Sequence, residues 1–129
     1  MVELKNEPAR CGEICVFEVF GDALAHEGDR PTAAVGMGVH PFRNPALTDE
    51  FAAEPLTIDV ADFHVYAADW RPERVDFLVD GEHVKSVGQA PDYPMQMMVA
   101  VFDFPEKGGP LHVPSFAVDV VRGSETFKT

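Results

Sequence analysis

Residues 12–20 alternate apolar and polar side chains in a run that is rich in β-branched and aromatic residues and bounded by glycines. This composition and the period of two predict a β-strand with one buried face. The alternation assigns Ile14 and Val16 to the core side of the strand, and Glu13 and Cys15 to the opposite side. The first carboxylate of the run is therefore expected to point away from the core.

Glu18 has the wrong parity for this arrangement, because it falls on the side of Ile14 and Val16. One extra residue at Val16-Phe17, a β-bulge, would bring Glu18 round to the side of Glu13, and bulges are common beside active sites. Two carboxylates on one concave sheet face are what retaining glycoside hydrolysis requires. The alternative is a strand edge that carries two solvated glutamates.

The separation of the two glutamates sets a demanding condition. Five residues of extended chain span about 16 Å at about 3.3 Å per residue, whereas the retaining mechanism needs carboxyl groups about 5–5.5 Å apart. The bulge, the curvature of the strand and inward-leaning side chains would all have to contribute.

The second half of the chain repeats short β-like runs that are separated by turn residues, a pattern that predicts an antiparallel sandwich. Asp80-Gly81 is the clearest hairpin signal, because a two-residue turn of the primed type needs positive φ. Residues 71–74 close another hairpin, in which Pro72 presets φ. The predicted strands after the first are residues 33–41, 56–60, 63–70, 75–79, 83–87, 95–102 and 116–122.

Two segments between these strands are predicted as loops. Residues 21–32 are rich in turn formers and directly follow the strand with the carboxylates, so ligand contacts are expected there. Residues 42–55 form the second loop, with one short helical turn over 47–53 that starts at the cap-like Thr48. Residues 95–102 are apolar on both faces, which is typical of a central strand covered on both sides.

The composition narrows the class of partner. The chain has 129 residues, enough for one domain, and a formal net charge of −12. Nucleic acids and anionic membranes are recognised by basic patches, so neither is an expected partner. A neutral ligand suits this charge better.

Cys11 and Cys15 are the only cysteines and lie four residues apart on the predicted strand. Their Cα atoms would be about 13 Å apart, beyond the approximately 7 Å limit for a disulfide. They are therefore predicted to be free thiols. A metal site built from Cys11, Cys15 and His40 is an alternative that the C-x₃-C spacing supports only weakly.

No run of about 18 apolar residues predicts a membrane span, and residues 1–10 lack the apolar stretch of a signal peptide. The sequence therefore shows no recognisable targeting segment.

Three segments resemble glycoside hydrolase family 16, the group of laminarinases, lichenases and agarases. Residues 13–18, EICVFE, are similar to the bulged family signature Glu-Ile-Asp-Ile-Met-Glu. Residues 62–81, DFHVYAADWRPERVDFLVDG, are similar to the family stretch FHVYAIEWTPDRIRFYVDG, and residues 116–122 resemble its closing VDYVRV strand. The chain departs from the family pattern at Cys15, where the family has Asp.

This resemblance implies a concanavalin A-like antiparallel β-sandwich, or jelly roll, made by residues 1–129 as a single, partial domain. In the family the catalytic strand falls near the middle of a longer domain, so we expect the N-terminal part of the sandwich to be missing here. The resemblance assigns Glu13 as the nucleophile and Glu18 as the acid/base, with Cys15 between them. It also implies an extracellular location for the parent family.

The resemblance further suggests substrate contacts. His40 lies in a segment similar to the family's Thr-Val-His-Gly strand, and Gln96 and Phe102 lie on a strand whose continuation lines the cleft. Trp70 has an aromatic face that could stack on a sugar ring, whereas the resemblance implies a structural position in the core. Asp119 matches a family position that helps to hold calcium, but because the other ligands come largely from the N-terminal part, we expect no cofactor in this chain.

We therefore expect a glycosidase that acts on a β-linked polysaccharide by the retaining two-carboxylate mechanism, impaired by Cys15 and by truncation. A non-catalytic carbohydrate-binding relative and an inactive fragment are the alternatives. In either case, exposed sheet edges would favour self-association.

Overall fold

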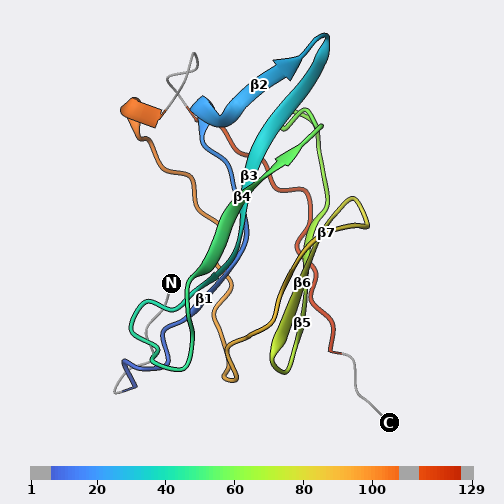
Figure 1. Ribbon diagram of the computed structural model, residues 1–129. Helices are drawn as coiled ribbons and strands as arrows, with labels where there is room; N and C mark the ends of the chain where they lie inside the picture. Colours follow the sequence, from blue (N-terminus) through green and yellow to red (C-terminus); the bar gives the residue numbers. More distant parts are fainter. Residues whose placement is uncertain (1–6, 108–113, 126–129) are drawn as a thin grey trace.

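The computed structural model describes residues 7–107 and 114–125, and nearly all of its regular structure is β (Figure 1). The first sheet has four antiparallel strands: β1 (Glu13–Glu18), β2 (Leu24–Glu27), β3 (Arg30–His40) and β4 (Glu50–Leu56). The second sheet has three: β5 (Tyr66–Arg71), β6 (Arg74–Val79) and β7 (Glu82–Val87). Two short 3-10 turns complete the described elements: η1 (Gly21–Ala23) and η2 (Pro105–Lys107).

Strand β3 is the centre of the first sheet. Strands β1 and β2 pair with its two halves along one edge, and β4 pairs along the other. In the second sheet, β6 lies between β5 and β7. All these pairings are antiparallel, which confirms the predicted all-β sandwich.

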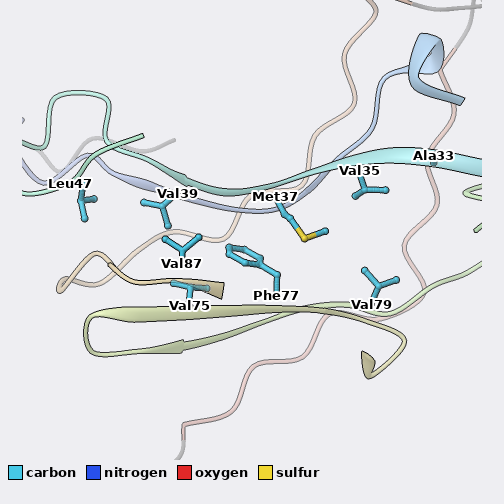
Figure 2. Packing of buried hydrophobic residues seen from close by; sticks show 9 residues of the cluster. All are labelled: Ala33, Val35, Met37, Val39, Leu47, Val75, Phe77, Val79 and Val87. Atoms are coloured by element: carbon cyan, nitrogen blue, oxygen red, sulfur yellow. The ribbon is translucent and has the colours of Figure 1, made fainter. Parts of the chain in front are cut away.

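The core lies between the two sheets (Figure 2). Every second residue of β3 contributes to it, because alternate side chains of a strand point to the same face. Burying one such side chain stabilises the fold by roughly 1.5–3 kcal/mol. The fully buried side chains of β3 and the strands that face it are Val35, Met37, Val39, Val75, Phe77 and Val87.

The same alternation sends Gly36, Gly38 and His40 to the other face of β3, away from the core. We call this surface the glycine face. Because two of its three β3 positions have no side chain, neighbouring strands can place large groups directly over the backbone.

Both predicted hairpins are present. Asp80 and Gly81 have φ angles of 51° and 83° and join β6 to β7, as a type I′ turn requires. Pro72 and Glu73 join β5 to β6, with Glu73 at a φ of 61°.

The predicted loops over residues 21–32 and 42–55 are wrong in part, because each contains a strand. The first contains β2 and the start of β3, joined at Gly28, whose φ is 62°. The second contains β4 instead of a helical turn. The Thr48 hydroxyl accepts a hydrogen bond from Gln89 at 3.0 Å, so it does not cap a helix. Pairing of β4 with the long β3 outweighs the weak local preference for a turn.

Four predicted strands are wrong wholly or in part. Residues 57–60 and 63–65 contain no strand, so β4 ends at Leu56 and β5 begins only at Tyr66. Residues 95–102 and 116–122 also form none: these segments run beside the sandwich as irregular chain (Figure 1). The side chains of Met97, Val101 and Phe102 are exposed. An apolar run becomes a strand only where a neighbouring backbone is present to pair with it.

Candidate active site

Strand β1 contains the predicted β-bulge. Cys15 pairs with Gly38 of β3, and the next registered pair is Glu18 with Gly36. Three steps along β1 thus match two steps along β3, so one extra residue is inserted at Val16-Phe17. The bulge reverses the parity of the strand after it.

This change of parity brings both carboxylates to the glycine face. Glu13 lies opposite His40, and the Cβ atom of Glu18 lies 3.4 Å from the point where a Cβ on Gly36 would stand. Ile14 and Phe17 pack against the core instead. Phe17 thus takes the core position that alternation assigned to Val16.

The register also sets the spacing of the two glutamates. Their partners on β3 are four residues apart, which is about 13 Å of extended strand. The two carboxyl groups can reach the separation of about 5–5.5 Å only when both side chains lean towards Cys15. The bulge therefore shortens the separation by one residue and turns Glu18 to the same face as Glu13. The rest of the distance between the carboxyl groups must be closed by the side chains.

Cys15 lies between the two carboxylates and is half-buried. Burial, then the negative charges of Glu18 and Glu13, raise the pKa of its thiol to about 12. The thiol is accordingly neutral at every pH at which a glycosidase works. It can offer a weak S–H donor to a neighbouring carboxylate, but it adds no charge between them.

A network of buried polar groups fixes the start of β1. The backbone N–H of Gly12 donates to the Tyr93 hydroxyl at 2.7 Å, and the Asn44 side-chain amide donates to the same oxygen at 2.8 Å. A Cβ on Gly12 would stand 2.8 Å from that oxygen, so the close approach requires glycine. The network holds the strand immediately before Glu13.

His40 and Phe51 form a stacked pair on the glycine face. Their ring centroids are 4.4 Å apart, with an angle of 29° between the planes. His40 Nδ1 lies 3.3 Å from Asp49 Oδ2, and this contact lowers the pKa of Asp49. His40 thus lies beside β1, opposite Glu13, and its side chain contacts Asp49.

The other predicted contact residues do not join this group. Trp70 lies at the end of β5 in the second sheet, where its indole N–H donates to the Pro91 carbonyl at 3.0 Å. Phe102 is 66% exposed and its ring lies 5.8 Å from that of Phe104, while Gln96 is exposed on irregular chain.

Sequence reasoning missed Phe51 and Tyr93. Phe51 could not be recognised as a strand residue, because its segment contains two prolines and is predicted as a loop. Tyr93 carried a usable signal, since a tyrosine beside a strand end needs a partner for its hydroxyl when it is buried.

Residues 7–107 and 114–125 gather no group of three or more His, Cys, Asp or Glu side chains that could hold a metal ion. Cys11, Cys15 and His40 therefore do not form the alternative metal site. Asp119 is exposed, lies on irregular chain and belongs to no such group among the described residues.

Comparison with known families decides the assignment. The sequence model described as glycosyl hydrolases family 16 matches residues 4–107. The chain belongs to glycosyl hydrolases family 16.

The family 16 match includes both glutamates of β1, all seven strands and the Asp80-Gly81 hairpin. It does not reach residues 116–122, the segment that resembles the closing family strand and in which the structure forms none. Neither the search of curated proteins nor that of solved structures found a match. No helix in the described residues is long and apolar enough to cross a membrane.

Proposed function

We propose that this family 16 chain hydrolyses the O-glycosidic bonds of a β-linked polysaccharide by a retaining mechanism with two carboxylates. The observation that carries the proposal is the bulge of β1, which brings Glu13 and Glu18 to one face of the sheet. The net charge of −12 suits a neutral polysaccharide.

The two glutamates divide the chemistry between them. The Glu13 carboxylate attacks the anomeric carbon, and the bond from that carbon to the leaving oxygen breaks as Glu18 donates a proton to it. A covalent glycosyl ester on Glu13 results. Glu18, now a carboxylate, takes a proton from water, and the water oxygen attacks the anomeric carbon and releases Glu13. The product keeps the β configuration.

The test is hydrolysis of mixed-linkage β-glucan and of β-1,3-glucan by the purified chain, followed through new reducing ends. We expect Glu13→Gln and Glu18→Gln each to abolish the activity, while Glu82→Gln on the exposed start of β7 leaves it unchanged. Proton NMR of the first product should show the β anomer. An α anomer would exclude the retaining mechanism, and unchanged activity in Glu13→Gln would exclude the proposed site.

A second candidate function is carbohydrate binding without hydrolysis. It is favoured by Cys15, because a neutral thiol with a pKa of about 12 cannot supply the charge that an Asp would place between the glutamates. Binding of β-glucan oligosaccharides without cleavage would favour this candidate. Neither binding nor cleavage would indicate an inactive chain.

A further inference from the structure

Phe51 is the one large aromatic side chain that β4 contributes to the glycine face. It pairs across the sheet with Gly38, and the residue is half-buried. His40 covers one side of the ring by stacking at 4.4 Å. The backbone N–H of Phe51 donates to Asp49 Oδ1 at 3.1 Å, which ties the base of the side chain to the partner of His40.

The two glycines of β3 make room for this ring. A Cβ on Gly36 would stand 2.4 Å from Cζ of Phe51, and one on Gly38 would stand 2.1 Å from the Glu50 carbonyl oxygen. Any side chain at either position would displace β4 or its phenylalanine. The ring can reach across β3 only because both positions are glycine.

The far edge of the ring ends beside the proposed acid/base. A Cβ on Gly36 would stand 2.4 Å from Cζ of Phe51 and 3.4 Å from the Cβ of Glu18. The tip of the Phe51 ring therefore lies near the base of the Glu18 side chain. At its other end the stacked pair reaches His40, which lies opposite Glu13. The two rings therefore run along the same face as the two carboxylates.

We propose that Phe51, supported by His40, is the stacking platform for a sugar unit next to the bond that is cleaved. Pyranose rings whose hydroxyls are all equatorial, such as β-linked glucose, present a flat face of C–H groups that packs on an aromatic ring. Phe51 is thus a substrate-binding residue, and the face of its ring that His40 does not cover sets the position of the sugar relative to Glu18. This inference deepens the proposed function and rests on it for the identity of the site.

The test measures binding of a β-1,3-linked glucose tetrasaccharide to the full chain by calorimetry, with Glu13→Gln as the background so that no hydrolysis interferes. In that background we expect Phe51→Leu to weaken binding about tenfold, which corresponds to about 1.4 kcal/mol. Leucine fills the space over Gly36 but has no aromatic face. Phe51→Tyr should restore the affinity, and Phe63→Leu, at an aromatic side chain that is 73% exposed, is the matched control.

The outcomes separate this inference from the proposed function. Loss of affinity in Phe51→Leu with rescue in Phe51→Tyr supports the platform, even if the chain with Glu13 intact cleaves no glucan. Unchanged affinity in Phe51→Leu overturns the platform, even if the chain cleaves glucan. Absence of any binding in the Glu13→Gln background, while the unsubstituted chain cleaves glucan, also overturns it. Equal weakening in Phe51→Leu, Phe51→Tyr and Phe63→Leu would show a general loss of structure and would count against it.

Discussion

At the scale of single residues, Cys15 stands where the family signature that residues 13–18 resemble has an aspartate. Its thiol lies between two glutamates and has a pKa of about 12. The family signature has a carboxylate there, so residues 13–18 of this chain carry one negative charge fewer than the signature. Two experiments on Cys15 measure the ionisation of its thiol and its effect on the rate of hydrolysis.

The first prediction is that Cys15 reacts slowly with iodoacetamide. At pH 8 a thiol with a pKa of about 12 is ionised in about one molecule in 10,000, whereas an ordinary thiol with a pKa of about 8.5 is ionised in about one in four. The more basic thiolate is the better nucleophile, so we expect a net rate about 10–100-fold below that of a free cysteine. Tandem mass spectrometry distinguishes labelling at Cys15 from that at Cys11.

The rate should rise as the pH rises towards 12, and Glu18→Gln should raise it at pH 8 because one of the neighbouring charges is removed. Fast labelling at pH 8 that is insensitive to Glu18→Gln would contradict the proposed position of the thiol between the carboxylates.

The second prediction is that Cys15→Asp raises the rate of β-glucan hydrolysis. It returns a hydrogen-bonding charge between the glutamates, and we expect a gain of about 10- to 1000-fold, which corresponds to roughly 1.4–4 kcal/mol of transition-state stabilisation. The rate is measured as kcat/KM on mixed-linkage glucan. Adding Glu13→Gln must remove the gain. A neutral or harmful Cys15→Asp would mean that the site uses the thiol itself.

At the scale of elements, the glycine face depends on close contact between β3 and β4. Gly38 has a φ of 146°, and a Cβ there would stand 2.1 Å from the Glu50 carbonyl oxygen. The third prediction is therefore that Gly38→Ala lowers the free energy of unfolding by about 2–4 kcal/mol, through backbone strain and overpacking. Urea denaturation followed by far-UV circular dichroism measures the loss. Gly88→Ala, which meets nothing within 4 Å, should change stability little, and equal effects of the two would be evidence against this tight contact.

The β6–β7 hairpin contains a pH-dependent contact. Asp80 Oδ1 accepts the Val65 N–H at 2.8 Å, and Asp80 Oδ2 lies 2.7 Å from His64 Nδ1. The hydrogen bond to Asp80 raises the pKa of His64, and the bonds from Val65 and His64 lower the pKa of Asp80. The ion pair therefore stabilises the fold above the ordinary pKa of Asp and below the raised pKa of His64.

The fourth prediction follows from that window. Asn tolerates the positive φ of Asp80 and keeps the acceptor for Val65, so Asp80→Asn removes mainly the charge. We expect the melting temperature of Asp80→Asn to lie a few degrees below that of the unsubstituted chain at pH 6, since an exposed pair contributes about 0.3–1 kcal/mol. The difference should shrink as the pH rises through the raised pKa of His64. A difference that is constant from pH 6 to pH 9 would show that the charge of His64 is irrelevant.

The strands show how much of the fold could be predicted from the sequence alone. The bulge could be predicted, because the parity of Glu13 and Glu18 conflicts with a single buried face and only an inserted residue resolves the conflict. The hairpin at Asp80-Gly81 could be predicted from its turn chemistry. Strand β4 could not, since an edge strand with Pro55 in it is held by the partner strand and has little preference of its own.

The candidate site was predictable to the same degree. Glu13 and Glu18 followed from the local pattern and His40 from the family resemblance, and the structure brings them to one face. Phe51 comes from a strand that was predicted as a loop, so its place beside them depends on the register of β4. The chemistry of Trp70 suits sugar binding, but its position on β5 places it in the second sheet, which no local pattern could predict.

At the scale of the whole molecule, much apolar surface is uncovered. The exposed large hydrophobic side chains of the described residues concentrate in two irregular segments, residues 97–104 and 116–121. Contiguous apolar patches of this kind mark surfaces that associate. Within residues 7–107 and 114–125, five strands also pair on one side only: β1, β2, β4, β5 and β7. An unpaired edge can accept another strand.

The last prediction is that the purified chain is marginally stable and self-associates. The net charge of −12 opposes association, so raising the salt from about 0.01 to 0.15 M should shift the equilibrium towards larger species as the Debye length falls from about 30 to 8 Å. Size-exclusion chromatography with light scattering at both salt concentrations measures the shift. A sharp monomer peak at both, with a cooperative melt above about 65 °C, would contradict the prediction. In that case the two sheets and their core would stabilise the chain without covering residues 97–104, and the uncovered apolar surface would have to be compatible with a stable monomer.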